Sequence, residues 1–185
     1  MAKVVSRTTN YSLNYMLDTC TINRLADSEE NTKLLFHSIQ YGYRYYKTDV
    51  QDRELIGIPD RTLEYEKAEA WKTSARAKIA IGILDGINAE RIPCVATPLR
   101  NFWLLDGSMR LWPDKGTGRV ADMMDEIFNG NIHHMRDAVI AEATVFSNCI
   151  LITADKRLYK KLKNYYPENV INYCDFLSKI TDLSS

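Results

Sequence analysis

The chain has 185 residues, of which 45% are hydrophobic and 26% are charged. This mixture is typical of a folded globular protein and excludes a disordered chain, and the length fits one domain with a substantial core. The 24 basic and 24 acidic residues cancel, so any surface that binds nucleic acid has to be local. No stretch approaches the roughly 20 apolar residues of a membrane span, so we expect no membrane-spanning helix.

The cysteines indicate a reducing compartment. Cys20, Cys94, Cys149 and Cys174 are irregularly spaced, with no Cys-x-x-Cys motif and no Cys/His pairing typical of zinc. Cys149 lies within an apolar run and is expected to be a buried free thiol. The start, MAKVVSRTTNYSLNYML, lacks the long apolar core of a signal peptide. We therefore expect a cytoplasmic protein with no membrane contact.

The first part of the chain predicts strands that alternate with helices. YMLDTCTINRLAD predicts a short strand that ends at Leu17, then a polar turn and the start of a helix. SEENTKLLFHSIQYGY has apolar residues at helical spacing. YRYYKTDVQDRELIGI predicts an aromatic strand and then a helix, with Thr48 and Gln51 at the spacing of a capping box.

The rest of the chain continues the alternation. RTLEYEKAEAWKTSARAKIAIGILDGI has no helix breaker before Gly82 and predicts a long helix. The following proline- and glycine-rich stretch predicts loops with short strands, and ADMMDEIF predicts another helix. DAVIAEATVFS predicts a buried helix, ILIT a buried strand, ADKRLYKKLKNYY a loop and a basic helix, and NVINYCDFLSKI a strand and a final helix. Strands separated by helices predict an α/β fold with a mainly parallel sheet.

Four acidic residues that are distant in the sequence are expected at one edge of this sheet. Asp18 directly follows a strand, and Asp155 lies two residues beyond another. Asp137 starts the helix that precedes the second of these strands, and Glu54 lies in the first two turns of a further helix. In a parallel sheet these positions share the carboxyl-terminal edge, where ligand sites of open α/β folds gather.

Gathered carboxylates suggest a bound cation. Like charges in one cleft repel each other, and proteins relieve this by protonation or by binding a cation. Oxygen ligands favour a hard ion such as Mg²⁺ or Mn²⁺, held together with waters and substrate phosphates. Such an ion polarises a phosphodiester and lowers the pKa of a bound water, so the acids suggest phosphodiester hydrolysis.

Several of these acids also have a simpler structural interpretation. Asp137 at a helix start is favourable as a cap or dipole partner, and Asp155 fits an Asx-type turn. Glu54 also fits a solvated surface position, and in that case Asp49 or Asp52 would be the acid of the site. Asp18, which follows the first apolar strand, is the hardest of the four to explain by a structural role alone. A shared site explains all four acids better than four separate structural roles.

The motifs around the acids resemble those of the PIN-domain family of metal-dependent ribonucleases. MLDTCTI looks like the family's first strand followed by its first aspartate and a threonine. TDVQDREL resembles its second block, in which the glutamate before a leucine is the acid. RDAVIAEATVFSNCILITADKRL resembles its third and fourth blocks. The likeness covers residues 14–57 and 133–178, and Cys20 stands where the family often has an asparagine.

The resemblance implies a fold, an activity and partners. The fold is a three-layer α/β/α sandwich with a central, mainly parallel sheet, as one domain over residues 11–180 that has an enlarged segment at about 58–132. The activity is endonucleolytic cleavage of single-stranded RNA with Mg²⁺ or Mn²⁺. Structured RNA, an antitoxin protein that neutralises a toxin nuclease and a second copy in a homodimer are the other partners that it suggests.

The resemblance also assigns roles to residues. The metal ligands would be Asp18, Glu54, Asp137 and Asp155. Thr19 and Thr153 would support them by hydrogen bonds to the ligands or to water.

Other polar and aromatic residues have two interpretations. Lys156, Arg157 and Lys160 directly follow the last acid and are candidates for binding the RNA backbone, but a solvated helix face explains them as well. The tyrosines of YGYRYY are better explained as core residues than as platforms for bases. His133 and His134 are better explained as loop residues than as phosphate contacts.

Two other functions compete with the ribonuclease. The first is a PIN-like RNA- or protein-binding regulatory module whose acids are idle. The second is a Mg²⁺-dependent phosphatase with Asp18 as its nucleophile, which would normally need another acid two residues later, where Cys20 stands. Cleavage of single-stranded RNA distinguishes the first of these from the ribonuclease.

Overall fold

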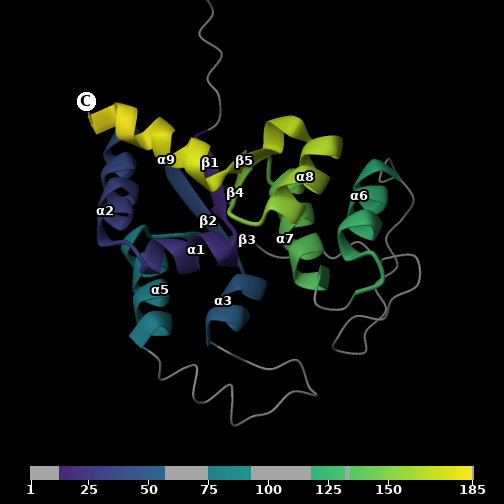
Figure 1. Ribbon diagram of the computed structural model, residues 1–185, viewed down its shortest axis with the longest axis horizontal. Helices are drawn as coiled ribbons and strands as arrows, with labels where there is room; N and C mark the ends of the chain where they lie inside the picture. The colour runs from purple at the N-terminus through teal and green to yellow at the C-terminus, as the bar shows by residue number, and fades with distance from the viewer. Residues whose placement is uncertain (1–12, 57–74, 93–117, 132–133, 185) are drawn as a thin grey trace, which may run out of the picture.

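A five-stranded, all-parallel sheet forms the centre of the protein (Figure 1). The computed structural model describes residues 13–56, 75–92, 118–131 and 134–184. In the sheet the strand order is β3-β2-β1-β4-β5. The strands are β1 (Asn14–Leu17), β2 (Arg44–Thr48), β3 (Glu90–Ile92), β4 (Ile150–Thr153) and β5 (Val170–Asn172).

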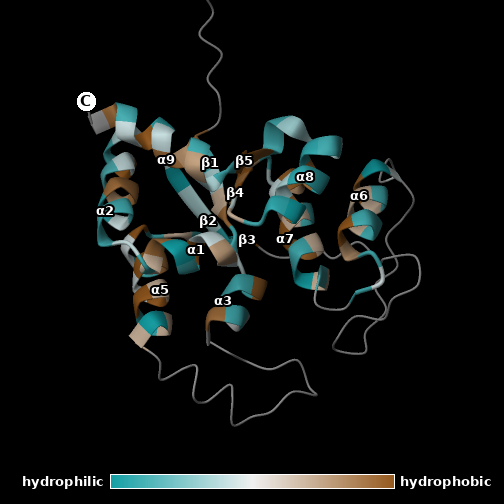
Figure 2. Cartoon of the chain, viewed as in Figure 1, coloured by the Kyte–Doolittle hydropathy of each residue, from teal (hydrophilic) through white to brown (hydrophobic). Residues whose placement is uncertain are grey.

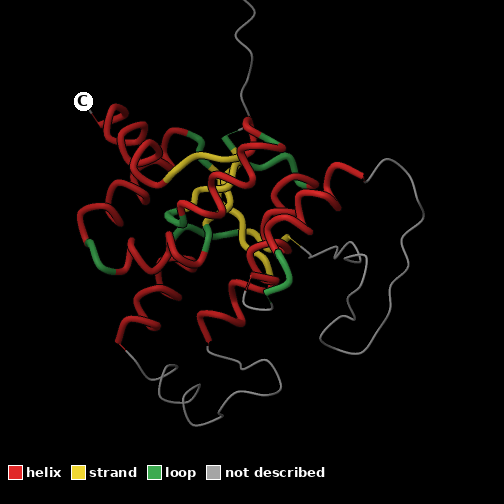
Figure 3. Tube along the Cα trace, turned by 45° about the vertical axis from the view of Figure 1, so that its right-hand side comes forward, coloured by secondary structure: helices red, strands yellow, loops and turns green. Residues whose placement is uncertain are grey.

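Helices cover both faces of the sheet, as Figures 1 and 3 show. One face carries α1 (Thr19–Ala26), α2 (Glu29–Ser38), α5 (Ala75–Gly86) and α9 (Tyr173–Thr181). The other face carries α6 (Gly118–Phe128), α7 (Met135–Phe146) and α8 (Lys156–Tyr165). A further helix, α3 (Asp49–Ile56), directly follows β2. The predicted three-layer α/β/α sandwich is confirmed.

Alternation along the strands creates two hydrophobic cores. In β1, Tyr15 and Leu17 are buried in the core under α1, α2, α5 and α9, whereas Met16 is buried in the core under α6, α7 and α8. In β4, Ile152 and Leu151 divide in the same way. Successive strand side chains point to opposite faces, so a sheet covered on both faces needs apolar residues at consecutive positions. This explains the continuous apolar sequences YML and ILIT.

Polar residues at the helix ends define where each helix starts and stops. Ser28 caps α2 by accepting a 3.3 Å hydrogen bond from the amide of Asn31. Asn88 and Asn148 follow α5 and α7 with φ of 49° and 51°. Asparagine tolerates this left-handed conformation better than most residues, and it ends each helix just before a strand.

Most of the predicted elements are confirmed, with one correction. No polar turn separates the first strand from its helix, because α1 begins at Thr19 with Asp18 as its N-cap. Of the long helix predicted in the middle region, residues 75–86 are helical, and the part before residue 75 lies outside the described residues. The described parts of segment 58–132 contribute a strand to the sheet and helices to both of its faces.

Three further observations concern the predictions made from the sequence. None of the described helices is long and apolar enough to span a membrane. Tyr43 and Tyr45 are buried in the core, as predicted for the aromatic strand, whereas Tyr41 is exposed. Cys149 is a buried free thiol, and burial raises its pKa to about 11. Cys94 lies outside the described residues.

Candidate functional site

Asp18 is the buried centre of the candidate site. It lies at the carboxyl end of β1 and is only 1% exposed. Its backbone amide donates to the carbonyl of Ile152 at 3.0 Å, which continues the pairing of β1 with β4. Although Asp18 is the N-cap residue of α1, its carboxylate accepts no capping hydrogen bond. The side chain is therefore not explained as a helix cap.

Thr153 joins two of the acids. Its hydroxyl donates a 2.8 Å hydrogen bond to Oδ2 of Asp18 and accepts one of 3.0 Å from the backbone amide of Asp155. Both interactions arise because β1 and β4 are adjacent parallel strands that end at the same edge. Thr153 therefore lies where its predicted supporting role requires, in contact with both Asp18 and Asp155.

Asp155 has a structural role as well as a place in the site. It is the N-cap of α8, and its Oδ1 accepts hydrogen bonds from the backbone amides of Arg157 and Leu158 at 2.7 and 3.1 Å. Its Oδ2 lies 3.9 Å from the guanidinium of Arg157. The structural interpretation of this acid is thus correct for one oxygen, and the second oxygen takes no part in the cap.

Asp137 lies in the first turn of α7 but is not its cap, because the helix begins at Met135 after His134. Its carboxylate forms an ion pair with Arg157. Burial raises the pKa of Asp137 to about 6 against the opposing effect of Arg157, and the neighbouring Asp155 and Glu54 raise it further. Because the pKa is raised despite the ion pair, the guanidinium does not fully compensate the partial burial of the carboxylate.

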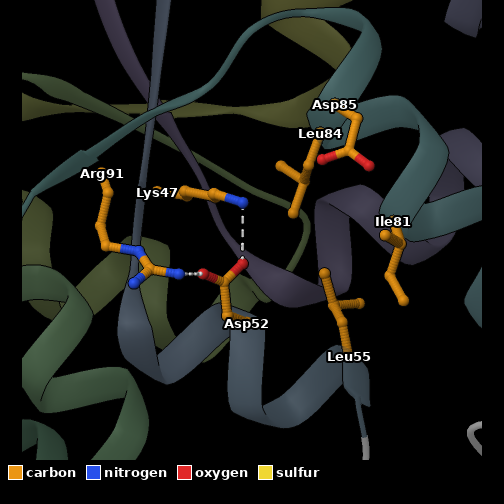
Figure 4. Close-up of a pocket in the computed structure, with 7 residues that line it drawn as sticks. All are labelled: Lys47, Asp52, Leu55, Ile81, Leu84, Asp85 and Arg91. Carbon is orange, nitrogen blue, oxygen red and sulfur yellow. Dashed lines mark hydrogen bonds and ion pairs between the residues drawn. The ribbon is translucent and has the colours of Figure 1, made fainter.

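Glu54 is the acid of α3 that belongs to the cluster. Thr19 donates a hydrogen bond to one of its oxygens, and Arg136 contacts the other at 3.2 Å. The alternatives on this helix are engaged elsewhere. Asp52 pairs with Lys47 and Arg91 at the wall of a separate cavity of about 220 Å³ (Figure 4), and Asp49 also pairs with Arg91.

The charges of the other three acids act on Asp18. Burial raises the pKa of Asp18 to about 7; the hydrogen bond from Thr153 opposes this rise, and Asp137, Glu54 and Asp155 add to it. Cys20 is exposed, but partial desolvation of its thiol and then the charges of all four acids raise its pKa to about 12. No described lysine or arginine forms a salt bridge with Asp18. The central carboxylate is thus surrounded by like charges.

The four acids offer the oxygen ligands that a hard cation prefers, but their side chains are not grouped around one position. Within the part of the chain that the structure describes, no three His, Cys, Asp or Glu side chains form a group that could hold a metal ion. Every side chain of the predicted ligand set nevertheless offers carboxylate oxygens, which Mg²⁺ and Mn²⁺ prefer. Instead, Arg136 and Arg157 form ion pairs with three of these carboxylates. The sequence pattern predicted neither pairing.

Gln51 positions this edge of the sheet in a way that its sequence motif only partly predicted. Its side-chain oxygen accepts a hydrogen bond from the amide of Thr48, as in a capping box, and its side-chain nitrogen donates to the carbonyl of Leu17. The hydroxyl of Thr48 makes no hydrogen bond among the described residues, so the box is half formed. Gln51 thereby ties the residue before Asp18 to the helix that carries Glu54.

The predicted RNA-binding residues differ in their surroundings. Lys156 and Lys160 are exposed on α8, a largely hydrophilic helix (Figure 2). Arg157 is turned toward the acids. The charge of His134 lowers the pKa of Asp137, so this histidine lies near the site, whereas His133 is outside the described residues.

No protein-family model matches the chain, and no curated protein matches it significantly. The likeness to PIN-domain ribonucleases therefore stays a prediction that rests on the motifs.

Proposed function

We propose that the protein is an endoribonuclease that cleaves single-stranded RNA with Mg²⁺ or Mn²⁺. The observation that carries this proposal is the buried carboxylate of Asp18, which lies among three further acids without a described basic partner. The charged form of such a group is unfavourable, and a cation bound at the edge where parallel strands end would compensate it.

The side chains have distinct tasks in this proposal. A divalent ion bound here would supply Lewis-acid activation of a phosphodiester and of an attacking water. It would be held by Asp18, Glu54, Asp137 and Asp155. Thr153 holds the carboxylate of Asp18 in place, and Thr19 does the same for Glu54. These hydroxyls fix the rotamers of two acids that come from different elements.

RNA would reach the acids along the start of α8. Lys156 and Lys160 are exposed within five residues of Asp155, so both can contact backbone phosphates beside the cleaved bond. A cytoplasmic toxin role, an antitoxin partner and a homodimer belong to the same proposal. An adjoining gene for a small protein with a DNA-binding motif would support the toxin role.

Cleavage of a labelled single-stranded RNA by the purified full-length protein tests the proposal. We expect cleavage with Mn²⁺ or Mg²⁺, none with EDTA, and a loss of roughly 100-fold or more in Asp18→Asn and Glu54→Gln. Asp49→Asn is the matched control, because this acid lies on the same helix as Glu54 but pairs with Arg91. Absence of metal-dependent cleavage, or equal cleavage by Asp18→Asn, would contradict the proposal.

One observation favours a second candidate, a regulatory module that binds RNA or protein without cleaving it. Arg157 and Arg136 already pair with acids, as expected if the acids are structural. In that case the protein would bind the labelled RNA equally well with EDTA and with Mn²⁺, and the RNA would stay intact.

A further inference from the structure

The guanidinium of Arg157 connects three parts of the candidate site. One terminal nitrogen pairs with Asp137 and lies 3.9 Å from Oδ2 of Asp155. The other donates a 3.0 Å hydrogen bond to the carbonyl of Ile127, near the end of α6. Its side chain is 30% exposed and that of Asp137 is 24% exposed. Arg157 is thus held by the protein in a position where its single positive charge pairs with Asp137 and also lies close to Asp155.

Arg136 is the second arginine that pairs with an acid of the candidate site. It precedes Asp137 on α7 and contacts Oε1 of Glu54 at 3.2 Å, while Thr19 donates to the second oxygen of Glu54. Of the four acids, only Asp18 forms no ion pair with an arginine among the described residues. Two arginines therefore share three carboxylates, and the basic charge falls short of the acidic charge.

These pairings put the two arginines in competition with a metal ion for three of the carboxylates. An arginine fork attracts carboxylate oxygens toward its own nitrogens, and a divalent ion needs the same oxygens about 2 Å from its centre. An arginine and a metal ion on the same carboxylates also repel each other. The ion pair with Arg157 and a bound divalent ion therefore compete for the carboxylate of Asp137.

We propose that Arg157, together with Arg136, is a built-in counter-ion that stabilises the metal-free site and is displaced when a divalent cation binds. This proposal rests on the proposed function, because it concerns the same four acids. The displaced guanidinium is then free, on the exposed side of the site, to contact an RNA phosphate. Metal binding and RNA binding are coupled in this way, and each strengthens the other.

Mn²⁺ binding to the full-length protein measures the competition directly. Electron paramagnetic resonance of free Mn²⁺ gives the dissociation constant for the unsubstituted protein, Arg157→Gln and Arg119→Gln. We expect Arg157→Gln to bind Mn²⁺ roughly three- to tenfold more tightly, because a competing ion pair and a repelling charge are both removed. Arg119→Gln is the control, because Arg119 contacts the carbonyl of Tyr165 and the ring of Tyr166 rather than an acid.

Thermal unfolding provides a second signature of the exchange. Without metal, Arg157→Gln is expected to melt roughly 2–4 °C below the unsubstituted protein, because the acids lose their counter-ion. Saturating Mn²⁺ is expected to abolish this difference, because the ion replaces the guanidinium. Arg157→Lys keeps a charge at the position and is expected to bind Mn²⁺ within about twofold of the unsubstituted protein. If Arg157→Gln does not fold, Arg136→Gln tests the same competition at Glu54.

The outcomes separate this proposal from the proposed function. Mn²⁺ binding with equal affinity in Arg157→Gln and in the unsubstituted protein overturns the counter-ion proposal and leaves the metal site intact. Weaker binding in Arg157→Gln also overturns it and makes the arginine a support for the metal. Absence of binding in every variant overturns the metal site, and the counter-ion proposal with it.

Discussion

The hydroxyl of Thr153 donates a 2.8 Å hydrogen bond to the carboxylate of Asp18, a residue 135 positions earlier in the chain. The contact exists because β1 and β4 are adjacent and parallel and end together. The same hydroxyl accepts from the amide of Asp155. One side chain therefore sets the relative position of two acids that belong to different elements.

Removal of this hydroxyl should weaken both stability and activity. Thr153→Val keeps the shape but leaves a buried carboxylate and a backbone amide without their partner, so we expect a loss of about 1–3 kcal/mol in the free energy of unfolding. RNA cleavage should fall roughly 10- to 100-fold, as for other residues that orient metal ligands. Urea denaturation and initial cleavage rates check this. Thr153→Ser should keep most of both, and equal losses in the two variants would contradict the role of the hydroxyl.

Stability without metal should decrease as the pH rises. The pKa of Asp18 is raised from 3.8 to about 7 and that of Asp137 to about 6, so between pH 4 and these values the folded state binds more protons than the unfolded state. The free energy of unfolding therefore falls with increasing pH across this range. Urea denaturation in EDTA at a series of pH values between 5 and 8 measures this slope.

Asp18→Asn provides the control for the pH dependence. The amide keeps an acceptor for Thr153 but carries no charge, so the slope should become shallower and the protein should gain on the order of 1–3 kcal/mol at pH 8. The same substitution should abolish RNA cleavage. A variant with an unchanged slope would show that other groups cause the pH dependence.

Gln51 should contribute to stability far more than its polar character suggests. Gln51→Leu fits a buried position but leaves the carbonyl of Leu17 and the amide of Thr48 without partners, so we expect a loss of about 1–3 kcal/mol. Gln40→Leu is the matched substitution at an exposed site and should change stability by less than about 0.5 kcal/mol. Similar effects in the two variants would contradict the bridging role of Gln51.

The lysines at the start of α8 should contribute to RNA affinity through charge alone. We expect the double variant Lys156→Gln/Lys160→Gln to reduce the slope of log K against log salt by about 1.4, for two phosphate contacts to a single strand. Fluorescence anisotropy in the Asp18→Asn background, where cleavage is blocked, measures this slope. Lys78→Gln, at an exposed lysine of α5, is the control and should leave the slope unchanged.

The sequence by itself predicted the layers and the edge at which the acids lie. Apolar runs such as ILIT predict strands covered on both faces, and short connections to helices make those strands parallel. The parallel arrangement alone places Asp18, Asp137 and Asp155 at the same edge. For this reason most of the secondary structure and the general location of the site followed from local patterns.

The tertiary structure decided which side chains engage each other at that edge. It selected Glu54 over Asp49 and Asp52, because the last two pair with Arg91. It also turned Arg157 onto Asp137, although its position beside two exposed lysines suggested an RNA contact. Local patterns assign a residue to a helix face or a strand end. They do not show which of several nearby charges will pair, because that depends on rotamers, burial and distances set by the whole fold.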